Sequence, residues 1–347
     1  MSSRRNCKKI LVGFSGGVDS TAAIYFLKKA GYQPVAFHLK LFKEGNEKFA
    51  RKIASKLGVE FIIEDISDVF KNKVIDYFIK EYSSNKTPNP CVKCNPEVKF
   101  HYLFKKADCL GIEKVATGHY AKIEKEDDCY NLKKGGDKSK DQSYFLYRLS
   151  QKELSRTIFP LAEKRKKDLK ELLERQRISF AKEESQDLCF FGKKEKLEDF
   201  IDSFSVKSRP GEIVNEKGDV LGRHKGLIYY TKGQRKGLLI GGSGPYYVIG
   251  KDIENNCLLV SNNVKHPFLL NKEIIVSDCN WICEEPQEGK KYQFKSRYQV
   301  DYSEGRIKKL SENKWKASLD VFQYAVSEGQ SLVVYDGAIV VGGGVIE

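Results

Sequence analysis

A glycine- and serine-rich octapeptide near the start of the sequence has the composition of an anion-binding turn. It consists of Gly13, Phe14, Ser15, Gly16, Gly17, Val18, Asp19 and Ser20. The short apolar run 10–12 precedes it, and residues 21–27 after it repeat their apolar side chains at helical spacing. A strand, a glycine turn and a helix direct backbone N–H groups toward an anion. The octapeptide therefore predicts a phosphate site.

Two common nucleotide motifs do not fit this loop. It has no Gly-Lys-Ser/Thr ending and no Gly-x-Gly-x-x-Gly spacing. The pattern Ser-Gly-Gly-x-Asp-Ser instead resembles the pyrophosphate loop of ATP pyrophosphatases, which cleave ATP between its α and β phosphates to adenylate an acceptor. ATP is therefore the expected cofactor. Asp19 is a candidate Mg²⁺ ligand at the phosphates, or a capping residue of the helix, and the two roles are compatible.

Cysteine thiols are the second group that predicts chemistry. Cys91 and Cys94 form a Cys-x-x-Cys pair in a loop with two prolines, which is typical of a zinc half-site, a redox pair or an iron–sulfur ligand pair. Lys93 and Lys99 are expected to lower thiol pKa values by stabilising thiolates. Cys189 lies between polar and apolar residues, a pattern that by itself is more typical of a core cysteine.

The elements that position these residues alternate between strands and helices. Strands are expected at 34–39, 59–63 and 115–118, and helices at 46–57, 68–82 and 97–110. This order predicts an α/β fold with a doubly wound parallel sheet, in which ligands bind at the carboxyl ends of the strands. Gly118 would then lie on the edge that carries the loop and allow close approach of a nucleotide. The adjacent His119 belongs to the same edge or is an ordinary exposed loop histidine.

The second half of the chain changes character. Short strands separated by glycine-rich turns predict a small mainly-β central domain, and longer alternating strands after it predict a C-terminal β-barrel. A basic helical region is expected at 154–177, where a run of charges is either solvated surface or an RNA contact. We expect three domains, at 1–198, 199–263 and 264–347.

Composition limits the classes of partner and compartment. The chain has 61 basic and 47 acidic residues, a net charge of +14, which favours a polyanionic partner such as RNA, although a lysine-rich genome produces the same bias. No run of 18 apolar residues and no signal-peptide core is visible, so we expect no membrane association and a cytoplasmic location. The nine cysteines are not expected to form a disulfide framework, and most of those outside the two motifs are expected to be buried.

Several segments, in order along the chain, together resemble the tRNA-specific 2-thiouridylase family. The match runs nearly end to end and includes similar segments of the second half. The segments that carry it are 15–20, 87–95, 116–121, 140–146, 185–190, 222–227, 230–238 and 342–346.

The resemblance implies ATP-dependent replacement of O2 by sulfur on the wobble uridine of tRNAs for Lys, Glu and Gln. It implies that Leu39 and Gly118 border the adenosine. Cys189 would receive a persulfide from a sulfur-donor protein, and Cys94 would help release the sulfur and end in a disulfide with Cys189. The implied tRNA contacts are Asn89, Pro90, Cys91, His119, Lys140, Asp141, Gln142, Arg297 and Tyr298.

Alternative readings of the mechanism stay open at this point. Some family members have aspartate where this chain has Cys91, so Cys91, Cys94 and Cys189 supply three thiolates that would suit a [4Fe–4S] cluster carrying sulfide. A different ATP pyrophosphatase, such as an amidotransferase-type synthetase, would share the loop but not the three cysteines. A non-catalytic RNA-binding module would explain the charge but not the loop.

Overall fold

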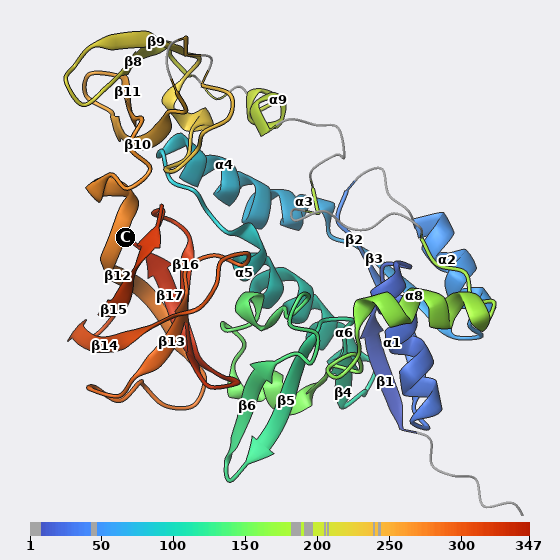
Figure 1. The fold of residues 1–347 in the computed structure, drawn as a ribbon. Helices are drawn as coiled ribbons and strands as arrows, with labels where there is room; N and C mark the ends of the chain where they lie inside the picture. The colour runs from blue at the N-terminus through green and yellow to red at the C-terminus, as the bar shows by residue number, and fades with distance from the viewer. Residues whose placement is uncertain are drawn as a thin grey trace, which may run out of the picture.

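The fold divides into three regions along the chain (Figure 1). The computed structural model describes residues 8–42, 47–181, 189–190, 197–204, 206, 208–238, 240–241 and 244–347. A parallel sheet with helices is followed by a small sheet and then by a larger antiparallel barrel. Among the described residues, no helix has the length and apolar character needed to cross a bilayer.

The first region is built on a five-stranded parallel sheet. Its strand order is β3-β2-β1-β4-β7, so the chain moves outward from β1 to one side and then to the other. The carboxyl end of β1 meets that of β2, where Gly13 lies beside Phe37. The strands are β1 (Lys9–Gly13), β2 (Gln33–Lys40), β3 (Glu60–Asp65), β4 (Lys114–Ala116) and β7 (Thr157–Ile158).

Alternating side chains of β1 explain why both faces of this sheet are covered. Ile10 and Val12 pack with apolar residues of α1 (Val18–Lys29) and α2 (Glu47–Lys56), whereas Leu11 packs with α6 (His101–Cys109) on the opposite face. A strand that is buried on both faces is typical of a doubly wound sheet. The predicted fold class is confirmed.

Two of the expected helices are not continuous α-helices. The segment 67–83 consists of α3 (Ser67–Phe70), a π-helical turn η1 (Lys71–Ile75) and α4 (Asp76–Ser83). The Cys-x-x-Cys pair lies in α5 (Pro90–Cys94), which continues through the π-helical η2 (Asn95–Phe100) into α6. Wide π turns inside helices often occur at functional sites.

The basic segment expected as one helical region is divided in the structure. It consists of α7 (Gln151–Arg156), the short strand β7 and α8 (Lys166–Arg175). Ser150 and Glu153 form a capping box at the start of α7, while Pro160 follows β7. The division places β7 at the edge of the sheet and α8 next to α1.

The central region contains a four-stranded sheet in the order β10-β11-β8-β9, as the predicted small mainly-β domain requires. Its core includes Ile213, Val248 and Leu258. The described helix α9 (Leu197–Asp202) precedes it. The strands are β8 (Gly211–Val214), β9 (Val220–His224), β10 (Tyr247–Asp252) and β11 (Cys257–Ser261).

The last region is a closed barrel of six strands, which confirms the predicted C-terminal β-barrel. The order β12-β15-β14-β13-β16-β17 is closed by pairing of β12 with β17. The strands are β12 (Leu270–Trp281), β13 (Tyr292–Lys295), β14 (Ser303–Ser311), β15 (Lys314–Tyr324), β16 (Ser331–Asp336) and β17 (Ile339–Ile346). Glycines 342–344 let the end of β17 approach its neighbours: a Cβ at Gly342 would lie 2.2 Å from the carbonyl oxygen of Asn280.

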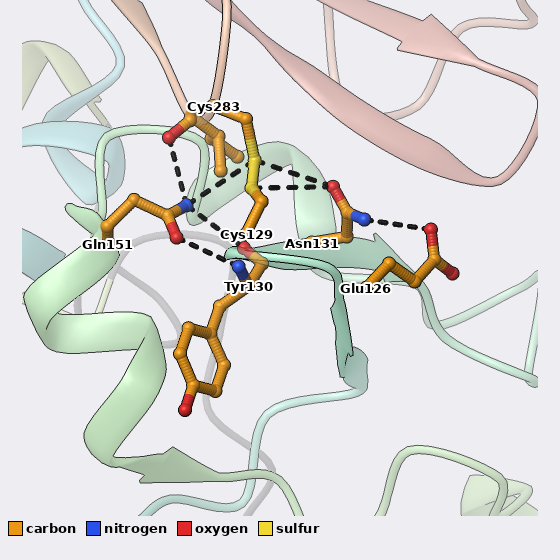
Figure 2. The surroundings of a disulfide bond; sticks show 7 residues. Glu126, Cys129, Tyr130, Asn131, Gln151 and Cys283 are labelled. Atoms are coloured by element: carbon orange, nitrogen blue, oxygen red, sulfur yellow. Dashed lines mark hydrogen bonds between the residues drawn. A yellow bond between two sulfur atoms is a disulfide. The ribbon is translucent and has the colours of Figure 1, made fainter.

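A hairpin from the first region is attached to this barrel. It comprises β5 (Ala121–Glu126) and β6 (Cys129–Lys134), and β6 pairs with β17 between Lys133 and Ile339. A disulfide joins Cys129 of β6 to Cys283, just beyond β12, and Gln151 lies beside it (Figure 2). The hairpin therefore connects the two regions by backbone pairing and by a covalent bond.

The disulfide and the exposure of other cysteines correct two expectations. Cys129 and Cys283 are 154 residues apart and were expected to be unpaired, yet their Cα atoms lie 6.1 Å apart. Cys109 is exposed, and Cys257 and Cys279 are only partly buried, so the expectation that most such cysteines are buried was wrong. Cys7 lies outside the described residues.

Candidate active site

The phosphate loop is held by its own serines and by the neighbouring strand. Ser20 Oγ lies 3.2 Å from Ser15 Oγ and donates to the Gly17 carbonyl oxygen at 3.2 Å. Phe14 N–H donates to the carbonyl oxygen of Phe37 at 2.8 Å. Gly17 precedes α1, and no side chain of the described residues caps this helix start. The first N–H groups of α1 are therefore well placed for an anion.

Gly16 and its neighbours also pack against other elements. Gly16 has a φ of +79°, and a Cβ there would lie 3.2 Å from Cα of Ala50 in α2. The backbone N–H of Ala181 donates to the Gly16 carbonyl oxygen at 2.8 Å, next to a β-bridge between Ala181 and Gly17. Glycine is required at position 16 by both conformation and space.

Gly118 is placed on the predicted edge, but its closest neighbours are protein atoms. A Cβ at Gly118 would lie 2.8 Å from the carbonyl carbon of Asp19 and 3.0 Å from the nitrogen of Ser20. Glycine at this position therefore lets the loop after β4 lie directly against the phosphate loop. Gly118 is thus needed for packing against the backbone of the phosphate loop. The expected approach of a nucleotide would be a second reason for glycine at this position.

Asp19 lies at the start of α1 between two partners that are distant in sequence. Its Oδ1 accepts a hydrogen bond from the Tyr120 hydroxyl at 2.6 Å, and its Oδ2 lies 3.4 Å from Lys166 Nζ of α8. The carboxylate is partly exposed. One such oxygen donor beside phosphate oxygens is the type of ligand set that Mg²⁺ takes in nucleotide sites.

A cavity of about 270 Å³ opens between the carboxyl ends of β1, β2 and β4, where the fold predicts a ligand. It is lined by seven of the ten residues expected to bind the nucleotide and by two expected tRNA contacts, His119 and Gln142, whereas Gly16, Gly17 and Val18 do not line it. Its lining is Gly13, Phe14, Ser15, Asp19, Ser20, Phe37, His38, Leu39, Leu41, Lys99, Leu103, Thr117, Gly118, His119 and Gln142.

Two neutral histidines border this cavity. His38 Nδ1 lies 2.9 Å from the carbonyl oxygen of Phe14, and burial lowers the pKa of His38. His119 Nδ1 lies 2.7 Å from Thr117 Oγ1, and its ring stacks on Phe100. Burial first, and then the charge of Lys99, lowers the pKa of His119 to about 3. His119 is therefore half-buried and neutral rather than a freely solvated loop histidine.

The thiols lie on the side of the site formed by α5. Cys94 is buried in the same apolar cluster as Phe190, which follows Cys189. Cys189 is exposed, Cys91 is half-buried, and all three thiols are free of disulfides. The rings of Phe70, Phe78 and Phe200 surround Phe190 at centroid distances of 6.2, 5.3 and 5.4 Å. Residues 185–188 of the cysteine motif lie outside the described part of the chain.

The expected lowering of thiol pKa values is wrong for Cys94. Burial raises the pKa of Cys94 to about 12, and the opposing effect of Lys99 is smaller. Lys93 does not act on this thiol: it pairs with Glu97 at 3.0 Å and lies over the Tyr77 ring. Cys94 is therefore a neutral thiol at neutral pH, and its thiolate needs added stabilisation.

The described residues do not form a metal-binding group. Nowhere in the described ranges do three Cys, His, Asp or Glu side chains lie close enough together to hold a metal ion. Cys91, Cys94 and Cys189 are all described, and they do not form such a group.

Some of the residues expected to contact tRNA lie where the first region meets the barrel. The loop before α5 is held by the barrel, because Thr87 N–H donates to the Glu328 carbonyl oxygen at 2.9 Å. Asn89 immediately precedes α5, and Pro90 is its buried first residue. Arg297 donates to Ser327 Oγ at 2.6 Å, and the ring of Tyr298 lies 4.6 Å from that of Phe145.

The segment 140–142 has three different environments. Lys140 is exposed and lines a second pocket with Lys166 of α8. The Asp141 carboxylate is buried and accepts hydrogen bonds from the backbone of Gly135 and Ser143 at 3.0 and 3.1 Å. Gln142 lines the nucleotide cavity, and its Oε1 accepts from Tyr120 N–H at 3.1 Å.

Sequence reasoning did not include four residues that the structure places here. His38, Lys99 and Tyr120 border the cavity or contact Asp19, and Lys166 reaches Asp19 from α8. Lys99 was considered only for its effect on the thiols. The position of His38 directly before Leu39 was a usable signal, whereas the approach of Lys166 depends on the packing of α8 against α1.

Comparison with known protein families divides the chain into the same three regions that the structure shows. Family models match residues 8–193 (tRNA methyl transferase HUP domain), 198–262 (tRNA methyl transferase PRC-barrel domain) and 271–346 (Aminomethyltransferase beta-barrel domain). A tRNA-specific 2-thiouridylase MnmA of Clostridioides difficile is 40% identical over 358 residues, covering 98% of both chains.

Two further relatives carry the same name. The protein of Syntrophomonas wolfei is 41% identical and covers 97% of this chain and 99% of its own, and that of Methylobacillus flagellatus is 38% identical and covers 98% of both. The chain belongs to the tRNA-specific 2-thiouridylase family. The three matched models coincide with the parallel-sheet region, the small β region and the barrel, in that order.

Proposed function

We propose that this protein is an ATP-dependent tRNA-uridine 2-sulfurtransferase acting on the wobble uridine of tRNAs for Lys, Glu and Gln. One observation carries the proposal: Lys99, which borders a cavity together with the phosphate loop and Gly118, also acts on the Cys94 thiol, in a chain that matches 2-thiouridylases over nearly its full length. An amidotransferase-type synthetase would use the same loop but has no role for this thiol. A cytoplasmic location belongs to the same proposal.

In the first step, ATP binds with its phosphates at Gly13 to Ser20 and its adenosine near Leu39 and Gly118. Carbonyl oxygen is a poor leaving group. Adenylation of uridine O2 by ATP releases pyrophosphate and makes this oxygen part of AMP, which is a good leaving group. Asp19 would hold Mg²⁺ together with the phosphates, and this ion would neutralise the charge of the pyrophosphate. The helix start and loop N–H groups bind the departing anion.

In the second step, a donor protein supplies a sulfur atom to the exposed Cys189, which gives a Cys189 persulfide. Its terminal sulfur attacks C2 of the uridine, and AMP leaves with O2 and the electron pair of the C2–O bond. The Cys94 thiolate then attacks Cys189 Sγ, so the S–S bond breaks and its electron pair stays on the sulfur at C2. The resulting Cys94–Cys189 disulfide is returned to two thiols by a dithiol reductant.

The remaining residues of the site would position the tRNA. We propose that the anticodon loop contacts Asn89, Pro90, Cys91, His119 and Lys140. Arg297 and Tyr298 would contact it from the barrel. Gln142 contributes from the cavity wall, and buried Asp141 holds Gln142 in place through its hydrogen bonds to the segment backbone.

The test is a thiolation assay on unmodified tRNA with ATP, Mg²⁺, a persulfide donor and a dithiol. The wild-type chain should form 2-thiouridine with release of one AMP and one pyrophosphate per product. Cys94→Ser and Cys189→Ser should each abolish thiolation while leaving ATP binding intact. Full thiolation by either variant, or a requirement for bound iron, would contradict the persulfide relay.

A further inference from the structure

Lys99 is the cationic side chain that links the nucleotide cavity to the thiols. It belongs to η2, the π-helical turn that directly follows the Cys94 turn. Its side chain lines the cavity together with Ser15, Asp19 and His119. A π-helical turn changes the direction of the side chains that follow it, and here it places a lysine between the phosphate loop and α5.

No carboxylate of the described residues neutralises this lysine. The titratable groups that act on Lys99 are thiols: burial alone would lower its pKa, but Cys94, Cys189 and Cys91, when ionised to thiolates, raise it above the ordinary value. Lys93, on the preceding turn, has the ordinary arrangement of a surface lysine, because it pairs with Glu97 at 3.0 Å. A half-buried cation without a carboxylate is costly unless an anion arrives.

The proposed reaction brings two anions to this position at different times. A nucleotide brings its phosphates into the cavity that Lys99 borders, and sulfur release requires the thiolate of Cys94. The groups that face Cys94 are Lys99, which favours its thiolate, and Cys189, Cys91 and Glu97, which oppose it. Among the described residues, Lys99 is therefore a cation that can offset both the burial of Cys94 and the charge of the phosphates.

We propose that Lys99 is a shared counter-ion, which binds the nucleotide phosphates during adenylation and stabilises the Cys94 thiolate after the nucleotide has left. This inference rests on the proposed function for the order of the steps. Because coupling between two sites is reciprocal, phosphate in the cavity suppresses the thiolate and the thiolate weakens nucleotide binding. Cys94 thus stays unreactive until AMP departs, which protects the adenylated base from premature disulfide formation.

The test measures alkylation of Cys94 in the full-length reduced protein as a function of pH, with each cysteine followed by peptide-resolved mass spectrometry. The nucleotide probe is α,β-methylene ATP, which cannot be cleaved between its α and β phosphates. In the wild type, a saturating concentration of the analogue should slow alkylation of Cys94 about tenfold, since an opposite charge within a few ångströms shifts a thiol pKa by roughly one to three units.

Lys99→Met should show slow alkylation of Cys94 with a pH midpoint raised by at least about one unit, and the analogue should have no further effect. Lys99→Arg should restore much of the wild-type profile, and Lys93→Met, the matched control on the neighbouring turn, should equal the wild type. If the analogue slows alkylation equally in Lys99→Met, it only shields the thiol, and the proposal is wrong.

The outcome is separable from that of the proposed function. A wild-type pH profile in a folded Lys99→Met variant would overturn the counter-ion role even if the enzyme thiolates tRNA. The opposite result is also possible: the wild type fails to thiolate tRNA, but the analogue still slows alkylation of Cys94 through Lys99. That result would reject the proposed thiolation reaction and retain the coupling between the nucleotide and the Cys94 thiolate. Near-ultraviolet circular dichroism of each variant establishes that it is folded.

Discussion

The Tyr120 hydroxyl donates a 2.6 Å hydrogen bond to Asp19, which lies 101 residues earlier in the chain. This bond fixes the carboxylate at the start of α1. Asp19→Ala should abolish pyrophosphate release and leave tRNA binding nearly unchanged. Tyr120→Phe should retain activity reduced by about tenfold, because a hydrogen bond to a charged group contributes about 1.5–3 kcal/mol. Pyrophosphate release and tRNA filter binding measure both effects.

Two controls accompany this prediction. Asp19→Asn keeps an oxygen for Tyr120 but removes the charge, so it should be as inactive as Asp19→Ala if the carboxylate holds Mg²⁺. Tyr25→Phe, on the same helix, removes a hydroxyl that has no hydrogen-bond partner among the described residues and should behave as the wild type. Activity in Asp19→Asn would show that the charge is dispensable.

Gly118→Ala should weaken ATP binding by displacing the phosphate loop. The added Cβ would lie 2.8 Å from the carbonyl carbon of Asp19, and backbone atoms cannot move aside as a flexible side chain does. Overpacking of this kind costs about 1–3 kcal/mol, so the ATP dissociation constant should rise about tenfold or more. Gly222→Ala is the matched control, because a Cβ at Gly222 meets no atom within 4 Å. Isothermal titration with ATP compares the two variants.

Phe190→Ala should uncouple sulfur transfer from ATP cleavage. The ring of Phe190 anchors Cys189 in the aromatic cluster that also buries Cys94. Without the anchor, we expect thiolation to fall at least about tenfold while pyrophosphate release continues, because the phosphate loop does not contact this cluster. Phe322→Ala removes an exposed ring of the barrel and serves as the control. Equal loss of both half-reactions would indicate general destabilisation instead.

Stability should fall in acid because of His119. The pKa of His119 is about 3 in the folded protein, mainly because of burial, but near 6.5 in the unfolded chain. The unfolded chain therefore binds the proton first, and stability is lost as the pH falls from about 6.5 toward 3. Between pH 6.5 and 5 this loss should be about 1–2 kcal/mol. Urea unfolding of His119→Gln should show a flatter pH profile than that of the wild type.

Removal of the Cys129–Cys283 disulfide should lower stability more than removal of another cysteine. The bond closes a segment of 154 residues, and cross-links of this kind typically contribute about 2–5 kcal/mol. Cys129→Ser should therefore lower the melting temperature, and a reductant should have little further effect on this variant. Cys257→Ser, at a half-buried free thiol, is the control. A reductant that leaves the wild-type melting curve unchanged would contradict this prediction.

The parallel sheet and the phosphate loop could be predicted because their signals are local. Apolar runs such as 10–12 mark strands that are buried on both faces, and the loop motif needs only eight consecutive residues. The two-residue strand β7 is too short to give a periodic signal. The π turns η1 and η2 depend on packing against neighbouring elements, so the pattern of their residues is that of an ordinary helix.

The contacts within the site were harder to predict because they join distant segments. Tyr120 and Lys166 meet at Asp19 only after the sheet and α8 have formed. The state of Cys94 was predicted incorrectly, since neighbouring lysines suggested a thiolate but burial decides the outcome. Sequence shows which charges are near along the chain, whereas desolvation depends on the complete fold.

The pairing of β17 with both β12 and β6 has a consequence for synthesis on the ribosome. Until residues 339–346 leave the exit tunnel, the barrel has two open edges and the β5–β6 hairpin has no partner strand. The nucleotide-binding sheet, complete with β7, can form long before that point. The nascent chain therefore holds a folded ATP site while its barrel is still an exposed sheet, and chaperone binding should concentrate on the barrel strands.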